Sequence, residues 1–210
     1  MNRSKAYLAT EFSVIFAGVP LIFYFELVRV PKILPLVAVT VFVLMVLLRD
    51  GEYKKRELWS LDEIDEVLPG LLVKFVLVFA VLVILVMVTR PQALFNFPRQ
   101  RLQLWGLVMV LYPLMSAFPQ EVIYRGFIFH RYKELLPEPW MKVATSTLAF
   151  SFLHIIYDNV PAVLLTLGGG YLFSRTYLKT RSVLITAIEH AIYGCCVFTI
   201  GLGHYFYEAL

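Results

Sequence analysis

The chain has 210 residues, a length that suits a single domain. Hydrophobic residues make up 60% and charged residues 16%, and the mean hydropathy is +0.74. Soluble domains are about half apolar and about a quarter charged. This composition excludes a water-soluble globule and predicts an all-α membrane protein with several spans. The net charge of +4 comes from Lys and Arg that cluster between apolar blocks, which is typical of membrane topology and predicts no nucleic-acid partner.

Apolar blocks predict a bundle of about seven to eight spans, because a span takes roughly 20 apolar residues. The blocks lie near residues 7–26, 33–48, 69–89, 102–119, 143–157, 161–178 and 183–203. The first is longer than the apolar core of a signal peptide, so we take it as a span. The fourth continues through Pro113 and Pro119, which predicts one long helix broken at a proline. Asp158 and Asn159 are expected to form a turn before Pro161.

The distribution of Lys and Arg predicts a cytoplasmic N-terminus. With seven crossings, 12 of the 19 basic residues fall in cytoplasmic segments and 5 in outer segments. The polar segment 49–67 contains Ser60 and Glu63 in a capping-box pattern, followed by apolar residues at helical spacing. It predicts a short amphipathic helix on the cytoplasmic face, with its charges in solvent. Residues 1–100 are expected to form N-terminal spans with this loop, and residues 101–205 a second unit.

Three polar motifs lie inside apolar blocks, where an ionisable residue costs about a few kcal/mol and is therefore a functional candidate. Glu121 and Arg125 are four residues apart, so they share one helix face and can pair. His154 and His190 each lie in a later apolar block. Taken singly, each motif has a structural explanation, as a buried ion pair or a packing histidine. Together they supply an acid and two imidazoles, which can activate water directly or through a metal.

The order Glu-x-x-x-Arg, Phe-x-x-x-His and His-x-x-x-small resembles a known family. The flanks Tyr124-Arg125-Gly126-Phe127 and Ser174-Arg175-Thr176 agree with it. The family is the CAAX protease and bacteriocin-processing (Abi) family of intramembrane endopeptidases, which includes type II CAAX prenyl endopeptidase-like proteins. The resemblance covers roughly Trp105–Ile200. It implies an integral membrane protease, in a bacterial cytoplasmic membrane, whose partners are membrane lipid and a membrane-associated protein or peptide substrate.

The resemblance also implies a role for individual positions, and makes residues 101–205 the catalytic core. His154 corresponds to the histidine that activates the attacking water, and His190 to a donor that stabilises the oxyanion. Glu121 and Arg125 correspond to a supporting ion pair. The function implied is hydrolysis of a peptide bond by water that a glutamate and a histidine activate.

Two positions depart from the family pattern. Gln120 stands where a first glutamate is usual, and a glutamine cannot act as a general base. Gly194 stands where an asparagine donor is usual. Two mechanisms fit these departures: Glu121 takes the base role, or Glu121, His154 and His190 bind a divalent metal such as zinc. The alternative function is a catalytically impaired member that acts as an immunity or binding factor in the membrane. A small transporter or proton relay is a third hypothesis.

Overall fold

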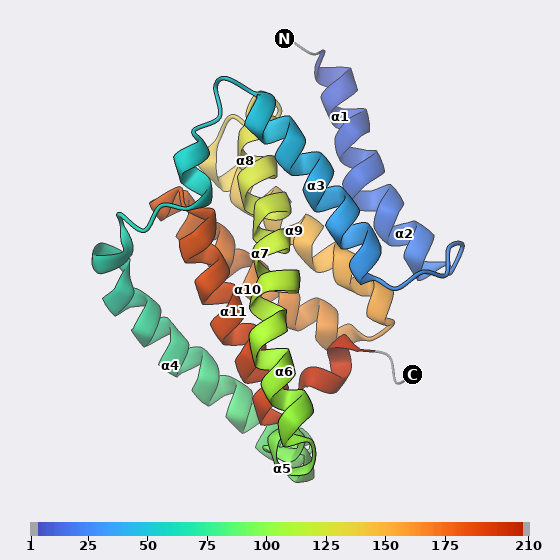
Figure 1. The fold of residues 1–210 in the computed structure, drawn as a ribbon, viewed down its shortest axis with the longest axis vertical. Helices are drawn as coiled ribbons and strands as arrows, with labels where there is room; N and C mark the ends of the chain where they lie inside the picture. The colour runs from blue at the N-terminus through green and yellow to red at the C-terminus, as the bar shows by residue number, and fades with distance from the viewer. Residues whose placement is uncertain (1–3, 208–210) are drawn as a thin grey trace.

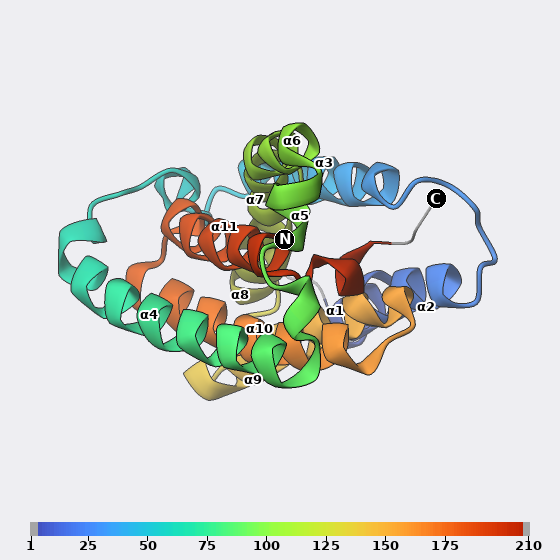
Figure 2. The same ribbon diagram turned by 90° about the horizontal axis from the view of Figure 1, so that it is seen from below.

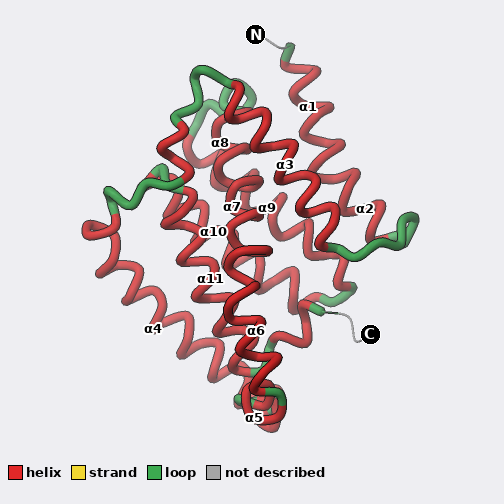
Figure 3. Tube along the Cα trace, viewed as in Figure 1, coloured by secondary structure: helices red, strands yellow, loops and turns green. Residues whose placement is uncertain are grey.

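The computed structural model describes residues 4–207, and 82% of these residues are helical, with no strand among them (Figures 1 and 3). The helices are α1 (Lys5–Ser13), α2 (Val19–Tyr24), α3 (Ile33–Arg49), α4 (Ile64–Thr89), α5 (Asn96–Gln100), α6 (Leu102–Tyr112), α7 (Phe118–Glu121), α8 (Ile128–Arg131), α9 (Pro139–Leu153), α10 (Val160–Thr180) and α11 (Val183–Ile200). Four helical segments of the described chain are long and apolar enough to cross a membrane: Lys5–Tyr24, Ile64–Thr89, Leu102–Arg131 and Val183–Ile200. The all-α membrane class is confirmed.

Helices α6, α7 and α8 form one continuous column through the middle of the molecule (Figure 1). The prediction of a long helix is confirmed, and its regular α-helical turns are interrupted at Pro113, although the helix continues. Two π-helical turns, Pro113–Ala117 and Val122–Phe127, lie on either side of α7. A π turn admits one extra residue, so the helix continues where a proline removes a backbone donor. The polar residues of α7 therefore lie between two irregular turns of the same helix.

Helices α9 and α10 pack closely where α10 carries three consecutive glycines. Only Gly170 makes the close approach, because a Cβ there would lie 3.1 Å from the Phe150 ring and 3.3 Å from the Thr147 carbonyl oxygen. The turn that leads into α10 is the one predicted. Asp158 adopts a left-handed conformation with φ of 51°, and the Asn159 side chain caps the helix by accepting from Ala162 N–H.

The segment between α3 and α4 is not the amphipathic helix that its sequence predicted. It contains one 3-10 turn, Lys55–Leu58, and α4 begins at Ile64, so Ser60 is not its N-cap. The reason lies in tertiary contacts: the Ser60 carbonyl accepts from the Ser182 hydroxyl at 2.6 Å, and Leu58 is buried in the core. These contacts hold the segment in an irregular path of turns and override its local helical pattern.

The charges of this segment are also not a simple solvated face. Glu57 accepts from the Tyr177 hydroxyl at 2.8 Å and pairs with Arg181 at 3.0 Å. Asp50 lies 2.9 Å from the His130 ring, and Glu52 pairs with Lys133 on the turn after α8. Ion pairs and hydrogen bonds therefore join this segment to the C-terminal half of the chain.

Helix α4 runs beside α10 and α11 on the outside of the bundle (Figure 2). Lys74, in the apolar part of α4, donates to the Glu189 carboxylate of α11 at 2.6 Å and to the Thr176 hydroxyl of α10 at 2.9 Å. Glu189 is almost fully buried. A charge that lies within an apolar helix thus finds its partner on a distant part of the chain.

Candidate active site

An ion pair lies at the centre of the molecule on the column α6–α8. The side chains of Glu121 and Arg125 are fully buried, and Arg125 Nη1 donates to Glu121 Oε1 at 3.1 Å. Arg125 Nη2 donates to the Gly170 carbonyl at 3.0 Å, and the guanidinium lies over the Phe150 ring at 4.6 Å. A buried charge requires such partners, because an unpaired one is strongly destabilising. The pairing that the four-residue spacing predicted is present.

His190, on α11, is held by contacts at both ring nitrogens. Nδ1 lies 2.7 Å from Glu121 Oε1, and Nε2 lies 2.9 Å from the Tyr112 hydroxyl. Because a carboxylate only accepts, Nδ1 carries the proton in the first contact. The ring also stacks on Phe173, with centroids 4.6 Å apart. Glu121 and packing therefore fix both the orientation and the tautomer of His190.

His154 follows the last residue of α9 and is buried. Its Nδ1 lies 2.8 Å from the Phe150 carbonyl oxygen, which only accepts, so Nδ1 carries the proton. The neutral ring then has its lone pair on Nε2. The imidazole of His154 is therefore held in the tautomer that a general base requires.

Both histidines line one chamber of about 330 Å³ between α4, α6, α7, α9, α10 and α11. Its walls are mostly apolar, from residues such as Leu82 and Phe173, with Gln120 and Tyr112 as polar members. Glu121 does not line the chamber. The structure therefore brings His154, His190 and Gln120 to one cavity and places the ion pair behind it. The volume is sufficient for water and part of a substrate chain.

Gln120 occupies the wall between this chamber and a second pocket. It is buried, its Nε2 donates to the Ser116 hydroxyl at 2.8 Å, and its Oε1 has no hydrogen-bond partner among residues 4–207. Ser116, Gln120 and Tyr157 also line a pocket of about 170 Å³ between the column and α1–α3. A buried carbonyl oxygen without a partner is uncommon. The amide oxygen of Gln120 is thus available to a water or to a substrate N–H.

The space beside Gly194 is filled by another residue. A Cβ at Gly194 would overlap the ring of Tyr112, so no side chain fits there while Tyr112 keeps its position. Sequence reasoning did not single out Tyr112. Its spacing could have indicated it, because Tyr112, Ser116 and Gln120 follow one another at intervals of four residues and so lie on one helix face.

The side chains do not form a preformed metal site. In the described part of the chain, no three His, Cys, Asp or Glu side chains come together in a way that could hold a metal ion. The proposed ligand set, Glu121, His154 and His190, is not assembled, because both nitrogens of His190 already contact protein groups. We therefore derive no catalytic step through a metal.

The fold and this cavity define an integral membrane protein with a buried chamber that two histidines line. The model of the family described as type II CAAX prenyl endopeptidase Rce1-like matches residues 102–196, which span α6 to most of α11. The match supports the resemblance to the CAAX protease family of intramembrane proteases that the motifs predicted. No curated protein and no solved structure has significant similarity to the chain.

Proposed function

We propose that this protein is an intramembrane endopeptidase that hydrolyses a peptide bond in a membrane-associated protein or peptide. The observation that carries the proposal is the chamber, because His154, His190 and Gln120 line one cavity within apolar helices. The matched family supports the same class of reaction. Helices α6 to α11 supply most of the lining, in agreement with a catalytic core in residues 101–205.

In the proposed reaction, His154 activates water. As the water oxygen bonds to the carbonyl carbon, Nε2 of His154 takes a proton from the water, and the carbonyl oxygen becomes an oxyanion. The intermediate then collapses, the C–N bond breaks, and the leaving nitrogen takes the proton from His154. The free Oε1 of Gln120 accepts the other hydrogen of the water and so orients it.

We assign Glu121 to a positioning role, because Arg125 and His190 share its Oε1 and its side chain does not reach the chamber. His190 lines the chamber in which the oxyanion develops, with its Nε2 against the Tyr112 hydroxyl. A carboxylate behind an imidazole stabilises the donor form of the ring, and preorganised donors of this kind make a large contribution to catalysis. Arg125 holds Glu121 in place and balances its charge.

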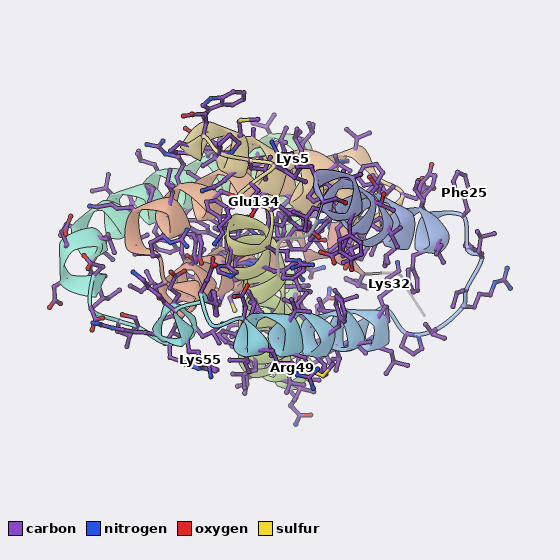
Figure 4. The ribbon with its side chains drawn as sticks, turned by 90° about the horizontal axis from the view of Figure 1, so that it is seen from above. Lys5, Phe25, Lys32, Arg49, Lys55 and Glu134 are labelled. Carbon is purple, nitrogen blue, oxygen red and sulfur yellow. The ribbon has the colours of Figure 1, made fainter. Side chains whose placement is uncertain are left out.

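We propose further that the N-terminus lies on the cytoplasmic side and that residues 1–100 form a cover around the core. Figure 4 looks onto the end of the molecule that carries Lys5, Arg49 and Lys55, in agreement with the excess of basic residues expected on that side. Residues 1–100 also contribute to the site, since Val78 and Leu82 of α4 line the chamber.

A cleavage assay with purified protein tests the proposal. The substrate is a fluorescence-quenched peptide with a prenylated cysteine near its C-terminus, and a peptide without the prenyl group is compared. We expect the protein to cleave the lipidated peptide and expect His154→Ala and His190→Ala to lose about 10²-fold or more in kcat. His204→Ala is the matched control, because His204 lies outside the chamber and contacts the Gly201 carbonyl. Cleavage that persists in both chamber variants would remove the proposal, as would a wild-type protein that cleaves neither peptide.

A further inference from the structure

Helices α6 and α11 meet where Tyr112 lies against Gly194. The glycine has no Cβ to obstruct the tyrosine ring, and any side chain there would overlap it. The ring packs edge-on against Phe198, with centroids 5.5 Å apart. The position of Tyr112 is therefore fixed by its surroundings, and the residue lines the chamber that holds the two histidines.

The Tyr112 hydroxyl contacts the nitrogen of His190 that faces away from Glu121. The distance from the phenolic oxygen to Nε2 is 2.9 Å, and Nδ1 on the other side of the ring lies 2.7 Å from Glu121 Oε1. A phenol has one O–H donor and two lone pairs. In the neutral ring, whose proton is on Nδ1, Nε2 accepts the O–H of Tyr112. In the imidazolium, which a carboxylate behind the ring stabilises, Nε2 donates to the phenolic oxygen, and the O–H of Tyr112 becomes available to a group in the chamber.

Two other hydroxyl groups of the chamber wall, those of Thr166 and Tyr193, donate elsewhere. Thr166 donates to the Ala162 carbonyl of its own helix at 2.7 Å. Tyr193 donates to Glu189 at 3.4 Å, on the side of α11 that faces Lys74. Tyr112 differs because its polar contact is an imidazole that is itself oriented by a buried carboxylate.

We propose that Tyr112 is a catalytic residue whose O–H donates to the carbonyl oxygen of the scissile bond as that oxygen becomes negative. The inference rests on the proposed peptidase function. Tyr112 forms no covalent bond and keeps its proton. His190 and Glu121 hold its oxygen from behind, and Gly194 provides the space in which the ring reaches this position.

Tyr112→Phe tests the role of the hydroxyl, because it removes one oxygen and keeps the ring against Gly194. We expect kcat to fall by about 10²–10³-fold, as when a donor to an oxyanion is removed elsewhere. The KM should stay within about twofold, since substrate binding does not use the O–H. The unfolding temperature should fall by no more than about 2–6 °C, because the variant loses one hydrogen bond, to His190, and keeps the packing of the ring. Tyr171→Phe is the matched control, because Tyr171 is exposed on α10 and does not line the chamber.

A second pair of variants tests the space beside Gly194. Gly194→Asn in the wild-type background should displace the Tyr112 ring and abolish cleavage. In a Tyr112→Ala background the same change places an amide donor in the vacated space, so the double variant should exceed Tyr112→Ala in kcat.

The outcomes separate this inference from the function on which it rests. If wild type cleaves, His154→Ala does not, and Tyr112→Phe retains kcat within about twofold, the inference fails and the peptidase proposal stands. The inference also fails if Tyr112→Phe loses activity only in proportion to its loss of folded protein at the assay temperature, because a residue needed for packing alone would behave in this way. If His154→Ala cleaves as well as wild type, the peptidase proposal and this inference fail together.

Discussion

The buried pair of Glu121 and Arg125 allows a quantitative prediction. Glu121→Leu removes the carboxylate and leaves the Arg125 guanidinium fully buried, with the Gly170 carbonyl as an acceptor and the rings of Phe150 and Phe173 as cation–π contacts. Loss of one partner from a buried ion pair costs about 3–5 kcal/mol, whereas replacement of both partners by apolar residues of similar volume is often neutral or stabilising. We therefore expect Glu121→Leu to lower the free energy of unfolding by about 3–5 kcal/mol and Glu121→Leu/Arg125→Met to recover most of it.

Thermal unfolding in detergent, followed by tryptophan fluorescence, measures this difference. For a chain of this size, about 1 kcal/mol corresponds to roughly 2–4 °C, so Glu121→Leu should lower the unfolding temperature by about 6–20 °C. The double variant should unfold near the wild-type temperature. Both should lack peptidase activity, because His190 loses the carboxylate that orients it.

A double variant that is at least as unstable as Glu121→Leu would refute this reasoning. That result would mean that the cost arises from lost packing and not from an unpaired charge. Arg125→Met provides the reciprocal control, since it leaves the Glu121 carboxylate with His190 as its remaining partner. It should also be less stable than the double variant.

Three further predictions follow from other parts of the structure. Gln120→Glu places a second proton acceptor in the chamber and should raise kcat on the same peptide by about tenfold or more; an unchanged or lower kcat contradicts it. Lys74→Met leaves the buried Glu189 without its cation and should cost about 1–3 kcal/mol in unfolding measurements while kcat is retained, and Lys74→Arg should cost less. The backbone N–H of Glu52, with help from His130, lowers the pKa of Asp50. A carboxyl whose pKa is lowered by folding stabilises the protein above about pH 4 and loses this effect in acid, so the unfolding temperatures of wild type and Asp50→Asn should converge as the pH falls to about 3.

The sequence correctly predicted the features that depend on residues close together along the chain. The apolar blocks predicted the helices, the four-residue spacing predicted the pair of Glu121 and Arg125, and Asp158 with Asn159 predicted a turn. Each of these follows from the geometry of a single helix or a single turn. The motifs also predicted the family, because their order along the chain does not require knowledge of the packing.

Contacts between distant segments could not be predicted in the same way. The contact of Glu121 with His190 joins residues 69 positions apart, and that of Lys74 with Glu189 joins residues 115 apart. Their formation depends on how α4 and α11 rotate against the column, which no local pattern specifies. In the segment around Ser60, the local sequence pattern predicted a helix that did not form, because a hydrogen bond from the distant Ser182 holds the segment in another conformation.

The neighbouring positions 120 and 121 have different physical consequences because they lie about 100° apart around the helix. Gln120 is on the face that reaches the chamber, so its side chain acts directly on whatever occupies that cavity. Glu121 is on the face that meets Arg125 and His190, so its charge acts on the stability of the core and on the orientation of the imidazole. A change at position 120 should therefore alter the rate with little effect on stability. A change at position 121 should alter both the rate and the stability. Loss of activity there can be attributed to the reaction itself only if the more stable double variant, Glu121→Leu/Arg125→Met, is also inactive.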